Sequence, residues 1–310
     1  MIIQSMQTKL NGVARLGHLG VIRVEGADAA SFLQSQLTQD FSSLGLSEAR
    51  LAAYCSAQGR MLASFYGFKR SHTEILLICS RDLLTPTVQR LSRFVMRAKA
   101  RLTDASDEYG VFGLAGDALD GLAGSSQSVW SKLDINDASM VFLYPADGAQ
   151  RALLLAPVTQ AAPAGSNLSP QAWALGEVRS GIAMISAATV EAFVPQMLNY
   201  ESVGGVSFKK GCYPGQEVVA RSQFRGTLKR RAFLAHSDAA MKAGDEVFQH
   251  DDAEQPCGIV AQAATAASGG FDAIVSLQIA AAGAGGLHLG SAAGPAVAVA
   301  AAPYPLLADI

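Results

Sequence analysis

The most informative stretch of the sequence reads Lys210-Gly211-Cys212-Tyr213-Pro214-Gly215-Gln216-Glu217-Val218-Val219-Ala220-Arg221. Two glycines and a proline favour a tight turn, because glycine tolerates unusual backbone angles and proline fixes its own. The residues after Pro214 are expected to form a short helix, in which Glu217 and Arg221 are spaced for an ion pair across one turn. The stretch therefore predicts a tight turn that leads into a short helix.

Cys212 is the candidate reactive residue of this loop. It stands beside Lys209 and Lys210 and just before the expected helix, and both positive charge and a helix N-terminus favour a thiolate over a thiol. One interpretation is a reactive or metal-touching cysteine. The other is a cysteine that is buried to pack the turn, and the residues alone leave both open.

A basic cluster follows the loop. It contains one aromatic residue and consists of Arg221, Phe224, Arg225, Lys229, Arg230 and Arg231. Such a cluster can meet a multiply anionic ligand or an RNA backbone. It can equally be a charged junction between two domains.

Composition limits the classes of function. The chain has 310 residues, which predicts two or three domains, and half of them are hydrophobic, which is enough for a substantial core. A net charge of −2 argues against electrostatic binding of nucleic acid by the chain as a whole. The four cysteines form no CxxC pair, so no intrinsic metal site is expected.

The ends of the chain bear on location. The N-terminus is too polar and too short for a secretory signal, and few cysteines in a long chain fit a reducing cytosol. The uncharged C-terminal region is rich in alanine and glycine and is broken by proline, so strands are expected there and not a membrane helix. A cytoplasmic protein without membrane contact is therefore predicted.

Apolar runs and turn residues predict a mixed fold. Strands are expected at residues 19–24, 51–54, 61–68, 75–79, 111–114, 140–144 and 152–156. Helices are expected from Asp28 to about Gln39, from Thr85 and Pro86 to Ala98, and from Ser169 to about Ser180 with Gly181 as the stop. Without regular βαβ alternation the class is α+β. Helical periodicity fades after about Gly226, and short apolar runs at 259–261, 273–277 and 296–299 predict a small β-barrel or sandwich.

The central stretch resembles the signature K-G-C-[FY]-x-G-Q-E-x-x-x-R of YgfZ-type proteins, which include a bacterial group linked to tRNA modification and a mitochondrial iron–sulfur assembly group. Weaker matches cover most of the chain. They include Gly26-x-Asp28-x-x-x-Phe32-Leu33-Gln34-x-Gln36-x-Thr38-x-Asp40, Gln58-Gly59-Arg60, Arg97-Ala98-Lys99, Arg179-x-Gly181, Phe193-x-Pro195-Gln196-x-Leu198-Asn199, Gly226, Lys229-Arg230 and Pro303-Tyr304.

This resemblance implies a fold and a ligand. The family is similar in fold to the glycine-cleavage T-protein, which binds tetrahydrofolate between a bipartite α+β portion and a C-terminal β-barrel. The implied division is residues 1–225, with an internal split near 100–110, and residues 226–310. The implied cofactor is tetrahydrofolate or a polyglutamylated folate, with Arg179, Arg225, Lys229 and Arg230 as candidate folate-binding residues.

The sequence departs from the T-protein at its catalytic position. That enzyme has an acidic pair four and five residues after the first glycine of a turn that corresponds to Gln58-Gly59-Arg60. Here the two positions are Ala63 and Ser64, and neither can act as a general base at neutral pH. Aminomethyl transfer by that mechanism is therefore not expected.

The resemblance and the departure together predict an accessory protein for iron–sulfur cluster assembly or repair, with folate and iron–sulfur client proteins as partners. Clients would include radical enzymes that thiomethylate tRNA, while direct tRNA binding is not expected. Cys212 would be the working residue, and Lys210, Gly211, Tyr213, Gly215, Gln216, Glu217 and Arg221 would shape its loop. The alternatives are a folate-dependent one-carbon transferase or demethylase with a different base, and an RNA-binding module.

Overall fold

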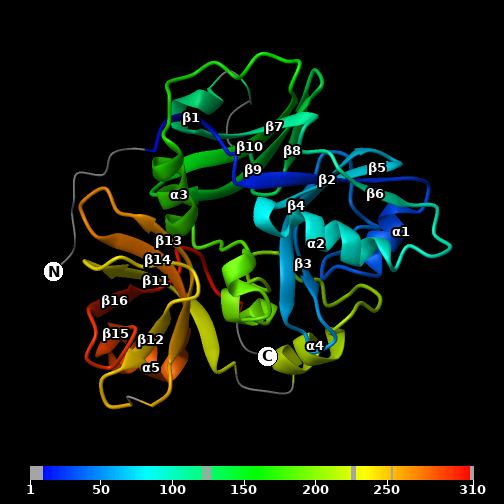
Figure 1. Cartoon of the computed structure of the whole chain (residues 1–310). Coiled ribbons are helices and arrows are strands. Elements are labelled where there is room, and N and C mark those ends of the chain that lie inside the picture. The colour runs from blue at the N-terminus through cyan, green and yellow to red at the C-terminus, as the bar shows by residue number, and fades with distance from the viewer. Residues whose placement is uncertain (1–9, 121, 123–126, 225–227, 253, 308–310) are drawn as a thin grey trace.

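The computed structural model describes residues 10–120, 122, 127–224, 228–252 and 254–307. They form two five-stranded antiparallel sheets and a closed six-stranded barrel, which occupies the lower left of Figure 1. The predicted α+β class with a C-terminal barrel is confirmed.

The first sheet carries the largest part of the core. Its strands, in the spatial order β3-β4-β5-β2-β6, are β3 (Ala49–Cys55), β4 (Met61–Ser71), β5 (Glu74–Ser80), β2 (Leu19–Glu25) and β6 (Arg101–Asp104). Seven consecutive residues of β4 are buried, which shows that both faces of this strand are covered. Each expected strand of this half of the chain is present.

Helix α1 (Ala29–Gln34) is shorter than predicted. It was expected to reach about Gln39, but Leu37 already forms a β-bridge with Tyr54, and the backbone N–H of Thr38 donates to the Ala53 carbonyl. Pairing with β3 therefore ends the helix. The Asp28 side chain does not cap the helix, because it accepts the backbone N–H of Lys99 at 2.7 Å.

Helix α2 (Arg81–Ser92) starts earlier and ends earlier than predicted. Thr85 and Pro86 were expected to begin it, yet the chain turns straight from β5 into the helix at Ser80, and Pro86 lies inside. The early turn buries Leu83 and Leu84 against the sheet. This burial offsets the backbone hydrogen bond that proline cannot donate.

The second sheet has the spatial order β1-β7-β10-β9-β8 and lies at the top of Figure 1. Its strands are β1 (Gly12–Arg15), β7 (Tyr109–Ala115), β10 (Ala149–Pro157), β9 (Ala138–Ala146) and β8 (Lys132–Ile135). The short 3-10 helix η1 (Gly116–Leu119) follows β7.

Helix α3 (Pro170–Arg179) begins and ends as the sequence predicts. The Ser169 side chain accepts the backbone N–H of Ala172, Pro170 occupies the first turn, and Gly181 has a left-handed φ of +73° just after the helix. The helix packs against β1 and β9 of the second sheet and against β13 and β14 of the barrel. It therefore joins these two parts of the molecule.

The barrel closes in the order β11-β14-β13-β12-β15-β16. Its elements are β11 (Arg230–Ser237), β12 (Glu246–Gln249), β13 (Gly258–Thr265), β14 (Phe271–Gln278), α5 (Ile279–Ala284), β15 (Leu287–Leu289) and β16 (Ala296–Ala300). None of the helices in the described ranges is long and apolar enough to span a membrane.

The segment between α3 and the barrel holds η2 (Ala187–Thr189), η3 (Pro195–Leu198) and α4 (Gln216–Phe224). Asn199, with a left-handed φ of +58°, ends η3 and bonds through its side chain to both backbone groups of Ala232 in β11. Tyr304, near the C-terminus, donates to the Gly181 carbonyl at 2.8 Å. These contacts fasten the barrel to the rest of the chain.

Candidate functional site: an exposed cysteine in an anchored loop

Lys210 anchors the loop that carries Cys212. Its buried ammonium donates to the carbonyls of Gln34, the last residue of α1, and of Leu37, the latter at 2.5 Å. It also lies 4.8 Å from the centre of the Tyr213 ring. Lys210 thus satisfies the carbonyl group of the last residue of α1, which the end of a helix leaves free, and a second carbonyl group of the segment that follows. Desolvation lowers the pKa of Lys210 to about 8, against smaller raising effects of Asp40 and Cys212.

Gly215 packs backbone to backbone against the β3–β4 turn. Its φ is +80°, and a Cβ there would stand 2.4 Å from the Ser56 carbonyl oxygen and 2.7 Å from the Gly59 Cα. Gly59 has a φ of +72°, and its own Cβ would meet Val218 at 2.9 Å. The turn that contains Gly59 and the loop that contains Gly215 therefore pack against each other, and this contact requires glycine on both sides.

The buried side of the loop and of α4 is also fixed. Tyr213 is buried, and this burial raises the pKa of its phenol. On α4, Val219 is fully buried and its carbonyl accepts the side-chain N–H of Gln196 at 2.7 Å. Gln223 is buried one turn further along. Lys210, Tyr213 and Gly215 therefore have structural roles.

Cys212 and Gly211 differ from these anchored neighbours, because both are exposed. A Cβ added at Gly211 would meet nothing within 4 Å, and the residue has no left-handed φ. Neither the backbone nor the packing of the described chain thus requires glycine at this position. The thiol of Cys212 stands beside open space, so the alternative of a cysteine buried in the turn is wrong.

The other three cysteines are buried. Burial raises the pKa of Cys55 and of Cys79 to about 12, in Cys79 with smaller contributions from Asp104 and Asp82. Burial also raises the pKa of Cys257, whose thiol donates to the Val247 carbonyl. Since the thiolate is the reactive form, Cys212 is the one cysteine of the four that is placed to react.

Helix α4 confirms the expected short helix but begins four residues after Cys212. The field of a helix terminus falls off within about one turn, so it acts less on Cys212 than the sequence suggested. Glu217 and Arg221 form the expected ion pair at 2.7 Å, with both side chains largely exposed. Gln216, the first helical residue, is partly exposed.

The described basic residues of the cluster between Arg221 and Arg231 do not form one patch. Arg231 is buried and pairs with the buried Glu201 at 2.7 Å, Arg221 pairs with Glu217, and Lys229 is exposed. Arg230 donates to two carbonyls, those of Cys257 at 2.8 Å and Pro256 at 3.3 Å. Arg225, the remaining candidate, lies outside the described residues, as does Gly226.

Arg179 lines a cavity of 510 Å³ between α3, the β9–β10 turn and the barrel. Its guanidinium bonds Asp147 at 2.7 Å and Asp272 at 3.0 Å, and Asp272 in turn bonds His236 at 2.8 Å. The guanidinium of Arg179, which was a candidate to bind folate, is thus already hydrogen-bonded to two carboxylates of the chain. The rest of the lining is mostly apolar.

Ala63 and Ser64 lie in β4 and are fully buried. The Ser64 hydroxyl accepts the Ile185 backbone N–H at 2.8 Å and donates to the Met184 sulfur at 3.6 Å. Both hydrogen-bonding directions of Ser64 are thus used inside the chain.

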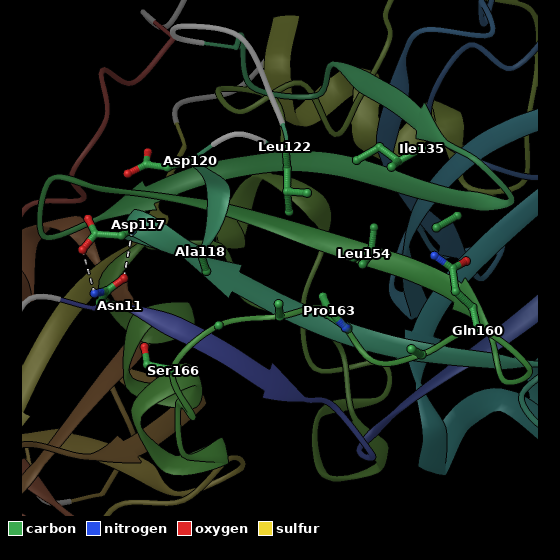
Figure 2. Close-up of a pocket in the computed structure, with 14 residues that line it drawn as sticks. Asn11, Asp117, Ala118, Asp120, Leu122, Ile135, Leu154, Gln160, Pro163 and Ser166 are labelled. Atoms are coloured by element: carbon green, nitrogen blue, oxygen red, sulfur yellow. Dashed lines mark hydrogen bonds between the residues drawn. The ribbon is translucent and has the colours of Figure 1, made fainter.

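A further cavity, of 600 Å³, lies on the second sheet (Figure 2). On one side of it Asn11 donates to Asp117 at 3.0 Å, and the Asp117 backbone N–H donates back at 2.8 Å. None of the candidate residues named from the sequence lines this cavity. Within the described ranges, no three His, Cys, Asp or Glu side chains gather as metal ligands would.

Comparison with solved structures defines the class of fold. The crystal structure of glycine cleavage system aminomethyltransferase T from Bartonella henselae matches this chain with a TM-score of 0.62. The match covers 96% of this chain and 87% of that chain, at 15% sequence identity. The fold is therefore that of the aminomethyltransferase T-protein.

Curated relatives define the family. The chain is 31% identical over 248 residues to the tRNA-modifying protein YgfZ of Colwellia psychrerythraea, which covers 76% of this chain and 74% of that protein. It is 33% identical over 237 residues to the protein of the same name from Edwardsiella ictaluri, with 70% and 69% covered. No protein-family model matches. The chain belongs to the YgfZ family.

Sequence reasoning did not single out Arg60 as a residue that lines a cavity. Arg60 was noted only as part of a turn, but it lines a cavity of 210 Å³ together with Arg230. The two arginines are 170 positions apart, so no local pattern could have paired them. The turn itself was the available signal, since it holds an arginine next to the glycine that contacts the loop.

Proposed function

We propose that this protein is a cytoplasmic, tetrahydrofolate-binding accessory protein for the assembly or repair of iron–sulfur clusters, with Cys212 as its working residue. Its client proteins would include cluster enzymes that thiomethylate tRNA. The observation that carries the proposal is the contrast within one loop. Lys210, Tyr213 and Gly215 are fixed by the chain, whereas Cys212 and Gly211 face open space.

An exposed thiol suits a macromolecular client. A small substrate can be enclosed, but a cluster held by another protein can be reached only from the surface. Cys212 meets this condition, and the three buried cysteines do not. The members of the family named above are tRNA-modifying proteins, which agrees with clients in that process.

The residues at the junction with the barrel fit a folate in part. Ligand cavities typically have a few hundred Å³ of mostly apolar lining and a few polar groups. The 510 Å³ cavity beside α3 has these properties. Arg179 of this cavity is already held by Asp147 and Asp272. Arg230 lines a different cavity, of 210 Å³, where its guanidinium can still receive a glutamyl carboxylate.

The test is complementation of a strain that lacks the protein, with the activity of cluster-dependent enzymes as the readout. Cys212→Ser should fold and bind tetrahydrofolate as the wild type does, yet fail to restore activity. Cys257→Ala is the matched control, because it removes a buried thiol, and it should restore activity. Full rescue by Cys212→Ser would refute the role of the thiol. Formation of product from an aminomethyl or N-methyl donor and tetrahydrofolate would instead favour the transferase alternative.

A further inference from the structure

Arg60 and Arg230 face a small cavity, and no carboxylate of the described residues neutralises them. The cavity measures 210 Å³ and is bordered by the turn before β4, by η3 and by three strands of the barrel. Arg60 donates one N–H group to the Ala192 carbonyl at 2.7 Å. Among the described residues, Arg230 donates only to the carbonyls of Cys257 and Pro256. Neither guanidinium lies within 4 Å of a described carboxylate, in contrast to Arg179 and Arg231.

The two charges also act on each other. Partial burial lowers the pKa of Arg230, and Arg60 adds to the lowering against a raising effect of Cys257. Two partly buried cations that repel each other are costly unless something negative comes between them. An arginine presents several N–H groups, so each guanidinium has donors left over after its backbone bonds.

A third polar group borders the same cavity. Ser276 in β14 is buried, and its hydroxyl has no hydrogen-bond partner in the described chain. A buried polar group usually has a partner, and its absence calls for an explanation. A bound ligand would supply one.

We propose that Arg60, Arg230 and Ser276 form a binding site for an oxyanion, either a carboxylate or a phosphate group of a small ligand. Guanidinium groups match both anions in charge and geometry. The cavity is too small for a whole folate, so the site would hold one anionic end of a ligand or a free anion. The inference reaches beyond the proposed function, although a glutamyl tail of folate is one of its two possible sources.

The proposed anion site lies next to the loop that carries Cys212. Gly59 packs against Gly215 of the loop that carries Cys212 and against Val218 of α4, and its neighbour Arg60 lines the cavity. In the turn before β4, Gly59 therefore contacts the loop that carries Cys212, and the next residue, Arg60, would contact the proposed anion. An anion held by Arg60 would fix the turn against which that loop rests.

Inorganic phosphate is the first probe, with the affinity taken from the rise of the melting temperature with phosphate concentration at constant ionic strength. Arg60→Gln and Arg230→Gln should each weaken binding about tenfold or more, as expected for the loss of a charge-assisted contact. Arg60→Lys, which keeps the charge but loses the forked geometry, should fall between Gln and the wild type. Because the Ser276 hydroxyl has no hydrogen-bond partner among the described residues, Ser276→Ala should melt as the wild type does and bind phosphate less tightly.

Arg50→Gln is the matched control. It also removes one positive charge, but Arg50 pairs with Glu48 at 2.8 Å and lies outside the cavity. Its phosphate affinity should equal that of the wild type. Equal phosphate affinity of the Arg60, Arg230 and wild-type proteins would overturn the proposal.

Calorimetry with tetrahydrofolate and its triglutamate identifies the source of the anion. If the site holds the glutamyl tail, the triglutamate binds more tightly to the wild type, phosphate competes with it, and Arg60→Gln removes the difference. If the site holds a free phosphate group, mono- and triglutamate bind alike while phosphate binding still depends on Arg60. Absence of any folate binding would refute the proposed folate function and leave the phosphate result standing.

Discussion

Replacement of Gly215 by alanine tests the contact between the two glycine turns. The new Cβ would meet the Ser56 carbonyl oxygen at 2.4 Å and the Gly59 Cα at 2.7 Å, and both are backbone atoms that cannot rotate away. The left-handed φ of +80° adds about 1–2 kcal/mol for a residue with a Cβ, and the overpacking adds about 1–3 kcal/mol. Gly215→Ala should thus lower the free energy of unfolding by about 2–5 kcal/mol.

Gly211→Ala is the matched control in the same loop. Its Cβ would meet no atom within 4 Å and its φ is ordinary, so the free energy of unfolding should stay within about 1 kcal/mol of the wild type, with a tendency to rise as the unfolded chain loses freedom. Urea unfolding of the three proteins gives both differences, provided that the slopes agree. If Gly215→Ala were within about 0.5 kcal/mol of the wild type, the packing of the two turns would be wrong.

Three further predictions concern charges and thiols. Glu201→Gln removes a buried carboxylate from Arg231 and should cost about 3 kcal/mol in urea unfolding, whereas Glu217→Gln in the exposed pair should cost about 0.5 kcal/mol or less; equal losses would contradict this difference in burial. The pKa of Lys210 is about 8 when folded and returns to its ordinary 10.5 when unfolded, so the folded form loses its proton first as the pH rises between these values. The stability of the wild type relative to Lys210→Met should therefore rise with pH above about 8, and a flat difference would speak against the buried ammonium. Iodoacetamide at pH 8 should label Cys212 in the native protein and all four cysteines after unfolding, as mass spectrometry of the peptides would show; early labelling of Cys55 or Cys79 would contradict their burial.

The fold could be predicted where local patterns decide it. Serine, proline and glycine mark both ends of α3, and apolar runs mark the strands. Local patterns failed where distant residues compete. Pairing of Leu37 with Tyr54 ends α1, and burial of Leu83 and Leu84 moves the start of α2 ahead of the proline that was expected to begin it.

The candidate site shows the same limit. The sequence pointed to the loop around Cys212, but not to the reason for each of its residues. Lys210 was expected to act on the thiol, whereas its ammonium mainly ties the loop to the end of α1. Which arginine keeps a free guanidinium depends on carboxylates far away in the sequence, such as Asp272 for Arg179 and Glu201 for Arg231.

The two places where chemistry could occur in this fold are arranged in opposite ways. At the two positions that the sequence resemblance sets against the T-protein's acidic pair, the Ala63 side chain offers no polar atom, and the Ser64 hydroxyl is fully engaged by Ile185 and Met184. On the surface, Cys212 is exposed in a loop that Lys210 and Gly215 hold rigidly. An enzyme that transfers a one-carbon group from a small donor in its interior needs a reactive group at positions 63 and 64. An accessory protein that acts on other proteins needs a reactive group on its surface, such as Cys212. This arrangement favours the accessory role over one-carbon transfer, because only the surface residue is free to meet a partner.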